Sequence, residues 1–326
     1  MCDSTLTCYN NGIDTEVMPN THLEHLEDSI FYGRRRALGA VKQALTLTSN
    51  ISVKYDGAPA IVFGTNPNNG KFFVGTKSVF NKKLIKINYT NEDIDKNHKG
   101  TVADILRLCL LYLPRISGIV QADWIGVGGG RVYRPNTIEY RFPSNVTEKI
   151  ILAPHTFYTY ISHHADGRLG ATIDSTTDVR FVNTMSARIS KCPFDGLDIL
   201  AKVVALLPNT KVPSAKARPE IMKHVNKFIR AGQQVSPHIL YVTVPDKYKG
   251  EVNLNTFKVW SLISQLKMRL LNAIETNDSI ECFIDDKHSD HEGYVIISNT
   301  PYKLVDRLNF SKANFNLDKN WTNEKV

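Results

Sequence analysis

The strongest chemical signal in the sequence is a lysine at the end of a short strand-like run. Residues 52–59 read S-V-K-Y-D-G-A-P, so Lys54 ends the run and a glycine turn follows it. An amine is a poor nucleophile while it is protonated, and it becomes reactive where burial and neighbouring cations depress its pKa. The role of Lys54 therefore depends on what the rest of the sequence contains. Without further elements the pattern would indicate a surface lysine at a strand end.

Five further segments with residues suited to phosphate, metal or base binding follow Lys54. A set of segments in a fixed order is more specific than any one of them. In chain order they are V-G-T-K-S at 74–78 with Lys77, V-Q-A-D-W-I at 120–125 with Asp123, I-I-L-A-P-H-T-F-Y at 150–158 with Phe157 and Tyr158, E-G-Y-V-I at 292–296 with Glu292, and P-Y-K-L-V at 301–305 with Lys303.

In this order the segments resemble the motifs of the covalent nucleotidyltransferases, which are the ATP-dependent DNA ligases, RNA ligases and mRNA capping enzymes. The K-x-D-G at Lys54 resembles motif I, and 74–78 resembles a basic segment of RNA ligases. The later segments are similar to motifs III, IIIa, IV and V. The resemblance spans residues 51–307 and implies a nucleotidyltransferase fold.

The resemblance implies covalent chemistry at Lys54. Its amine would attack the α-phosphate of ATP, giving a Lys–AMP phosphoramidate and pyrophosphate. Lys303 would neutralise charge on that phosphate and help to keep Lys54 deprotonated. Glu292 would hold Mg²⁺ (or Mn²⁺), directly or through water, and Asp123 would bind the metal or the ribose.

The resemblance also implies binding roles. Asp56 and Gly57 would lie at the nucleotide, with Gly57 allowing close backbone approach because it lacks a Cβ. Phe157 or Tyr158 would stack on adenine, and the residues themselves equally indicate core side chains. Asp123 on its own is also consistent with a residue that caps a turn before the glycine-rich loop at 126–130.

A basic stretch follows the motif I region. Lys77 would contact the phosphate of a second substrate, and Lys82 and Lys83 extend the same stretch. A solvated basic face is the alternative interpretation, and such a face still attracts a nucleic-acid backbone. The formal net charge of +8 and the pI near 9.1 agree with a polyanionic partner.

The sequence departs from the family pattern in three places. Motif V normally offers two lysines, but Pro301 and Val305 flank Lys303. Asp123 stands where many relatives have the longer glutamate. Only 19 residues follow Arg307, so we expect no C-terminal OB domain. These departures question full ligase activity more than nucleotide binding.

Two terminal motifs resemble a group of tailed-phage proteins. These proteins combine H-L-x-H-L-E-D, here at 22–28, with K-Y-D-G-A-P-A at 54–60 and Y-K-L-V-D-R at 302–307. A bacteriophage origin would place the protein in the host cytoplasm. Five scattered cysteines without a C-x-x-C pair predict neither a disulfide framework nor a cysteine zinc site. No apolar stretch approaches a membrane span, so we expect a cytoplasmic protein without membrane contact.

The elements that position these residues form an α+β pattern. We expect N-terminal helices near 21–31 and 35–47, then antiparallel sheets, then a helical insertion. Strands are predicted at 51–53, 60–63, 71–74, 118–125, 131–133, 150–160, 281–284 and 293–298, and helices at 102–113, 197–207, 219–231 and 256–275. The expected domains are an N-terminal segment at 1–50, a nucleotidyltransferase core at 51–194, a helical insertion at 195–280 and the end of the core at 281–326.

A dense cluster of aspartates and histidines at 285–291 directly precedes Glu292. Its loose spacing favours a solvated loop, and a mixed metal site is the alternative.

The functional hypothesis is an ATP-dependent, ligase-like nucleotidyltransferase. It would pass AMP from Lys54 to the 5′-phosphate of a nucleic acid before strand sealing, with RNA favoured over DNA. The first alternative is a different acceptor, such as a cap, a protein or a metabolite. The second is a degenerate, non-catalytic member that binds nucleic acid. The oligomeric state stays open.

Overall fold

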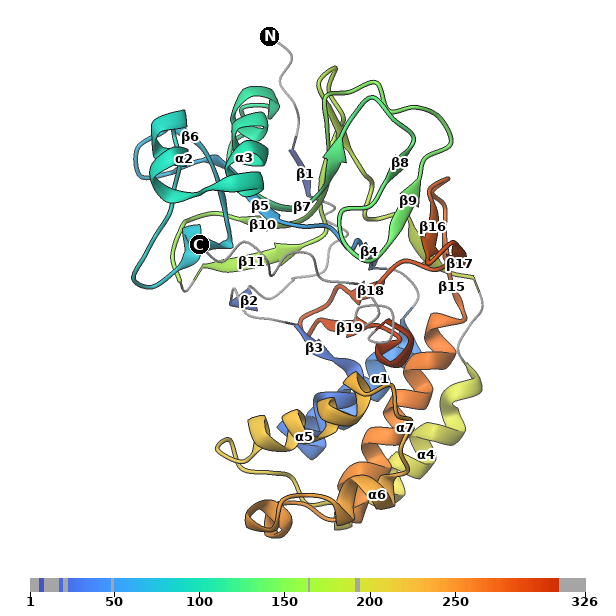
Figure 1. Cartoon of the computed structure of the whole chain (residues 1–326). Helices are drawn as coiled ribbons and strands as arrows, with labels where there is room; N and C mark the ends of the chain where they lie inside the picture. Colours follow the sequence, from blue (N-terminus) through green and yellow to red (C-terminus); the bar gives the residue numbers. More distant parts are fainter. Residues whose placement is uncertain are drawn as a thin grey trace. The chain divides into compact units, whose positions relative to one another are not determined.

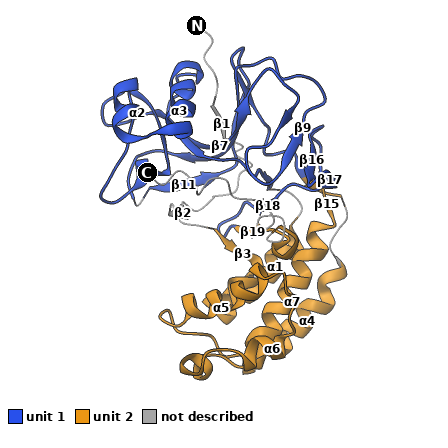
Figure 2. Cartoon of the chain, in the orientation of Figure 1, with its two compact units in different colours: residues 1–22, 51–187, 276–301 blue, residues 23–50, 188–275, 302–326 orange. Residues whose placement is uncertain are grey.

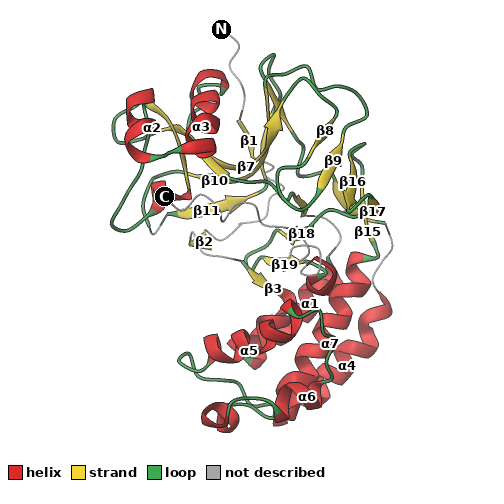
Figure 3. Cartoon of the chain, in the orientation of Figure 1, coloured by secondary structure: helices red, strands yellow, loops and turns green. Residues whose placement is uncertain are grey.

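The computed structural model describes residues 6–8, 18–19, 23–47, 50–163, 165–190 and 194–310. Helices make up 38% and strands 25%, and most strand pairs are antiparallel, which confirms the α+β class (Figure 3). Within these residues no helix is both long and apolar enough to cross a membrane. Cys109 and Cys282 are free, buried thiols.

The chain forms two compact units (Figure 2). The sheet unit comprises Met1–His22, Ile51–Ala187 and Thr276–Pro301, and the helical unit comprises Leu23–Asn50, Arg188–Glu275 and Tyr302–Val326. This grouping differs from the four consecutive segments that the sequence suggested. Both the region after residue 22 and the region after residue 301 join the central helices, because charged residues from all three are buried together.

The sheet unit is built on a seven-stranded sheet with the order β2-β11-β10-β7-β5-β6, and β13 pairs with β10 beside this path. The neighbours are antiparallel except for β13 and β10. The strands are β2 (Met18–Pro19), β5 (Ala60–Thr65), β6 (Phe72–Thr76), β7 (Ile119–Val127), β10 (Ile150–Tyr158), β11 (Asp166–Leu169) and β13 (Val179–Phe181).

The two faces of this sheet have different roles, because side chains alternate along each strand. On β7, Val120, Ala122 and Trp124 pack in a core with α3 (Gly100–Tyr112). Gln121 and Asp123 therefore lie on the opposite face. The short helix α2 (Asn91–Asn97) precedes α3 (Figure 1). It begins with a capping box between Thr90 and Asp93.

Smaller ladders complete the sheet unit. β4 and β18 are antiparallel partners, β8, β9, β16 and β17 form a four-stranded sheet, and β1 pairs with β12. The bounds are β1 (Leu6–Cys8), β4 (Ile51–Lys54), β8 (Val132–Tyr133), β9 (Glu139–Arg141), β12 (Ala171–Ile173), β16 (Glu281–Ile284), β17 (Lys287–Ser289) and β18 (Gly293–Ile296), with the 3₁₀ helix η2 (Lys77–Phe80) after β6.

The helical unit packs its helices around α7 (Leu254–Leu271), which begins with a capping box between Asn253 and Thr256. Two short strands, β3 and β19, pair in parallel in the same unit. The other elements are β3 (Glu24–His25), η1 (Leu26–Tyr32), α1 (Arg34–Thr46), η3 (Phe194–Gly196), α4 (Leu197–Leu206), η4 (Leu207–Asn209), α5 (Arg218–Arg230), α6 (Pro237–Val242), η5 (Asp246–Glu251) and β19 (Tyr302–Leu304); β14 (Ala187–Ile189) and β15 (Ile274–Thr276) lie where the chain passes between the units.

A buried charge cluster joins three parts of the helical unit. Lys267 Nζ lies 2.7 Å from Glu27 Oε1, and Arg307 Nη1 lies 3.0 Å from the same oxygen and 3.1 Å from Asp28 Oδ1. The indole Nε1 of Trp260 donates to Asp28 Oδ1 at 2.9 Å. Burial alone would raise the pKa of Glu27, but Lys267 and Arg307 lower it well below its usual range. The two terminal motifs therefore meet in this cluster.

The structure corrects the first expected helix, near residues 21–31. Thr21, near which it was expected to begin, lies outside the described residues. The region forms β3 and the 3₁₀ helix η1 instead, and residues 26–31 are all buried. A 3₁₀ helix therefore replaces the expected α-helix over these residues. The second expected helix matches α1 closely.

Candidate active site

Lys54 and Glu292 are brought together by the register of β4 and β18. Lys54 is the last residue of β4 and is paired with Gly293, and Glu292 directly precedes Gly293. Lys54 Nζ donates to Glu292 Oε2 and forms an ion pair with it. The side chains are only 26% and 14% exposed, so the pair is largely withdrawn from water.

The charges around Lys54 favour its protonated form. Burial lowers the pKa of Lys54, but the carboxylates of Glu292, Asp123 and Asp56 raise it, and the net direction is upward. The sequence suggested neighbouring cations that would depress this pKa, so the surroundings of Lys54 differ from that expectation. In the ligand-free protein Lys54 is an ammonium ion held by an acceptor.

Asp123 lies on the sheet face opposite α3, and its charge interacts with those of Lys54 and Glu292. It is paired with Ala60 of β5 and Ala153 of β10. Burial raises its pKa to about 7, Lys54 lowers it, and Glu292 raises it. Its Oδ2 lies 3.8 Å from His155 Nε2. Asp123 is therefore a partly buried carboxylate that a cation would stabilise.

His155 is a site residue that sequence analysis missed, although it lies inside the motif IIIa segment. Burial lowers its pKa to about 3, and the charges of Lys77 and Lys54 act in the same direction. Its Nδ1 lies 2.6 Å from Thr156 Oγ1, and its Nε2 lies 3.4 Å from Gln121 Nε2. A neutral imidazole therefore lies beside Asp123.

Lys77, the residue after β6, adds a positive charge to the same group. Thr76, the last residue of β6, is paired with Ile61, next to the Ala60 that is paired with Asp123. Lys77 is exposed, and its charge acts on both Asp123 and His155. Lys82 and Lys83 follow in an exposed stretch after η2.

The carboxylate of Asp56 holds the loop between β8 and β9 through hydrogen bonds. Oδ1 accepts from Asn136 Nδ2 at 2.8 Å, and Oδ2 accepts from the backbone N–H groups of Thr137 (2.7 Å) and Ile138 (3.1 Å). Its own N–H donates to Tyr140 Oη at 2.6 Å. Both carboxylate oxygens are thus engaged by the protein, which differs from the expected nucleotide contact.

Gly57 is required by the packing of the turn against β7. A Cβ at this position would lie 2.6 Å from Asp123 Cβ and 2.7 Å from the carbonyl oxygen of Trp124. The close approach that the sequence suggested is therefore to β7, beside Asp123. Absence of a side chain at Gly57 sets the distance between the Lys54 turn and Asp123.

Phe157 and Tyr158 are core residues in this structure. Phe157 packs on the α3 side of the sheet and covers Gly118, on the face opposite Asp123. Tyr158 is buried against Phe80, with ring centroids 4.6 Å apart, and donates to Gln121 Oε1 at 3.2 Å. The core alternative describes both rings better than stacking on adenine does.

Sequence analysis also missed a hydrogen-bonded group around Asp278, which holds the chain neighbours of Lys54 and Glu292. Asp278 Oδ2 accepts from Tyr55 Oη at 3.2 Å and from Ser186 Oγ at 3.1 Å, and it lies 3.4 Å from His291 Nε2. Tyr55 follows Lys54, and His291 precedes Glu292. Asp278 thereby links the neighbours of both catalytic candidates, and no spacing in the sequence indicated this.

The cluster at 285–291 forms a hairpin and a buried histidine. Asp285 and Asp286 form the turn between β16 and β17, both with positive φ (48° and 60°). His291 is buried, and its Nδ1 lies 3.5 Å from Cys282 Sγ. Among the described residues, no group of three or more histidine, cysteine or acidic side chains is arranged to hold a metal ion.

Lys303 belongs to the helical unit, whereas the other candidates belong to the sheet unit. It lies in β19, paired with His25 of β3. Burial lowers the pKa of His25 well below its usual range, and the charge of Lys303 contributes in the same direction.

Comparisons with known proteins place the chain in a family without giving it a function. No curated protein and no solved structure matches it significantly. Residues 20–319, nearly the whole chain, match the family described as "Family of unknown function (DUF6267)". The match includes every candidate residue from Lys54 to Lys303. The protein is therefore a member of the DUF6267 family.

Proposed function

We propose that the protein is an ATP-dependent nucleotidyltransferase that forms a covalent Lys54–AMP intermediate. The observation that carries the proposal is the β4–β18 register, which sets Glu292 against Lys54 although 238 residues separate them. Asp123, His155 and Lys77 complete a compact group of charged and polar residues. Each of the five lies in a different segment of the motif set.

Lys54 supplies the nucleophile. Its Nζ lone pair would attack the α-phosphorus of ATP, a P–N bond would form, and the bond to the β-phosphate oxygen would break to release pyrophosphate. Nζ must first lose a proton, and Glu292 Oε2 is the acceptor in contact with it. The step changes no oxidation state and releases protons from the amine.

Glu292 and Asp123 suit a hard divalent cation. Mg²⁺ is commonly held by one or two carboxylates together with substrate phosphates and water, so two protein ligands suffice. The raised pKa of Asp123 supports this fit, because an adjacent cation would favour its charged form. Bound Mg²⁺ would neutralise charge on the triphosphate. Neutral His155 would orient Asp123, and exposed Lys77 would meet a phosphate.

The proposed acceptor is the 5′-phosphate of a polynucleotide, with RNA favoured over DNA. Lys54 would regain its proton as the P–N bond breaks and AMP passes to the phosphate. A 3′-hydroxyl would then displace AMP, a phosphoryl transfer that depends on positioning and charge neutralisation. The fold family, the cofactors and this acceptor are parts of the same proposal.

Incubation with Mg²⁺ and α-labelled ATP tests the proposal, with label on the protein read from a denaturing gel. Wild-type protein and Lys71→Ala, which alters an exposed lysine of the same unit, should become labelled. Lys54→Ala should carry no label, and Glu292→Gln should carry at least tenfold less.

Parallel reactions with labelled GTP and NAD identify the donor. Mass spectrometry of the purified protein checks that Lys54 is free of AMP at the start. Folded, unmodified protein that takes label from none of the three donors would contradict the enzymatic proposal.

A further inference from the structure

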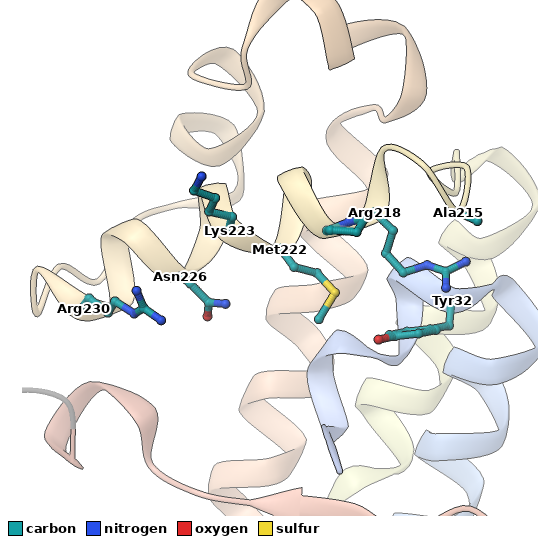
Figure 4. Close-up of a pocket in the computed structure, with 8 residues that line it drawn as sticks. Tyr32, Ala215, Arg218, Met222, Lys223, Asn226 and Arg230 are labelled. Atoms are coloured by element: carbon teal, nitrogen blue, oxygen red, sulfur yellow. The ribbon is translucent and has the colours of Figure 1, made fainter. Parts of the chain in front are cut away.

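The helical unit contains a basic groove along α5 that the Lys54 chemistry does not use. The groove has a volume of about 400 Å³. Its lining includes Tyr32, Arg218, Met222, Lys223, Asn226 and Arg230 (Figure 4). Its lining contains three cationic side chains and no carboxylate. All of these residues belong to the helical unit.

The cations lie along one stretch of α5. Arg218 and Arg230 mark the ends of this helix, and Lys223 lies between them. Twelve residues of α-helix rise about 18 Å, over which one strand of a B-form duplex presents about five phosphates. Residues 214–230 hold five basic side chains and one acidic side chain, Glu220. The surface is thus strongly and locally positive.

Arg218 is fixed in place by contacts that are not ion pairs. Its Nε donates to the carbonyl oxygen of Phe31 at 3.0 Å, and its guanidinium lies over the Tyr32 ring, 4.2 Å from the centroid (Figure 4). Stacking and a carbonyl contact leave the positive charge in place. Holding the side chain in advance reduces the entropy that a ligand must overcome on binding.

The groove's cations form no close ion pair with a carboxylate, although the charge of Arg218 also acts on Glu24. In the part of the chain that the structure describes, no carboxylate oxygen lies within 4.0 Å of a basic nitrogen of Arg218, Lys223 or Arg230. Glu24, whose charge acts on the Tyr32 hydroxyl, is itself paired with Arg36 at 3.7 Å.

We propose that this groove binds the phosphodiester backbone of a polynucleotide, with Arg218 as its fixed anchor and Lys223 and Arg230 as exposed charges. A planar guanidinium held at one end of the groove suits a phosphate, which it can contact through two N–H groups. The inference rests on the proposed function only for choosing a polynucleotide over other polyanions. It requires neither ATP nor Lys54.

Fluorescence anisotropy with a 3′-labelled, 5′-phosphorylated RNA of 20 nucleotides tests the groove, in the absence of ATP and across a range of NaCl concentrations. Three lost phosphate contacts lower the slope of log K against log [salt] by about 2 for a single strand, which is about one hundredfold in affinity at 0.1 M. Arg218→Gln/Lys223→Gln/Arg230→Gln should show this change.

Two further variants guard against misfolding and against general charge effects. Lys223→Gln/Arg230→Gln alters only exposed side chains and should weaken binding about 25-fold. Lys227→Gln removes a charge from the same helix outside the groove and should change binding less than threefold. Because RNA binding is measured without ATP and labelling of Lys54 is measured separately, failure of this inference and failure of the covalent chemistry are distinguishable.

Three outcomes would overturn the inference. They are wild-type affinity in both groove variants, an equal loss in Lys227→Gln, and a loss confined to Lys82→Gln/Lys83→Gln in the sheet unit. Binding of phosphatidylserine vesicles in place of RNA would likewise assign the groove to another partner.

Discussion

The hydroxyl of Tyr55 donates a hydrogen bond of 3.2 Å to Asp278, a residue 223 positions later in the chain. Asp278 also lies 3.4 Å from His291 Nε2. Burial raises the pKa of Asp278, but the hydrogen bonds from His291 and Ser186 and the charge of His291 outweigh it and leave the pKa below the usual range. Tyr55 adjoins Lys54 and His291 adjoins Glu292, so one carboxylate fixes the chain on both sides of the proposed catalytic pair.

Asp278→Asn should therefore impair the Lys54–Glu292 pair without touching it. We expect about tenfold slower labelling of Lys54, with a smaller change in the ATP concentration required for half-maximal rate. Ser186→Ala removes one hydrogen bond to the same oxygen and should have a smaller effect. Unchanged labelling rates in Asp278→Asn would show that Asp278 serves stability alone.

Gly57→Ala should destabilise the sheet unit and disturb Asp123. The added Cβ would lie 2.6 Å from Asp123 Cβ and 2.7 Å from a backbone oxygen that cannot easily move. Overpacking of this kind typically costs about 1–3 kcal/mol. Gly39→Ala is the matched control, because nothing lies within 4 Å of its Cβ position in α1 and alanine favours a helix. Urea unfolding should move the two variants in opposite directions.

Lys267→Met should strongly destabilise the helical unit. Glu27 would keep Arg307 but lose the ammonium 2.7 Å away, and removing one partner of a buried pair costs about 3–5 kcal/mol. Glu27→Gln/Lys267→Met removes both charges and should recover part of that loss. Urea unfolding of the single and double variants measures this, and a double variant less stable than Lys267→Met would contradict it.

His155 should make folding stability depend on pH. Its folded-state pKa, about 3, is below its ordinary value near 6.5, so the unfolded chain binds the extra proton between these values. His155 therefore does not lower the folding stability above about pH 6.5. Below that pH it does, and the loss of stability grows as the pH falls toward 3.

His155→Gln should flatten that part of the stability profile. Chemical unfolding at pH 7 and pH 4.5 compares the two proteins, and the wild type should lose more stability on acidification than the variant. An equal loss in both would mean that His155 becomes protonated in the folded protein.

The sequence predicted the elements that have strong periodicity and clear ends. The expected strands near Lys54 and the helices at 102–113 and 197–207 correspond to β4, α3 and α4, and only their ends differ by a few residues. The order of the segments also placed Lys54, Asp123 and Glu292 among the candidates that the structure brings together.

The supporting residues could not be found in this way, because their roles depend on tertiary contacts. Nothing local to Asp278 indicates that Tyr55 and His291 will meet it. Phe157 and Tyr158 have the aromatic side chains that a base-stacking site needs. Successive side chains of β10 point to opposite faces of the sheet, so the two rings enter two different cores, which only the structure shows. The apolar residues of η1 fit a helical period, but that period does not distinguish an α-helix from the 3₁₀ helix that forms there.

The separation of Lys54 and Glu292 by 238 positions also sets when the site can exist. At a synthesis rate of roughly 5–20 residues per second, Glu292 leaves the ribosome about 12–48 s after Lys54. β18 is the partner of β4 and follows the entire helical insertion, so during that interval Lys54 lacks its ion-pair partner. A chain cut short anywhere before β18 would carry the K-x-D-G sequence and yet lack the acid beside it, so that only finished molecules would present the complete pair.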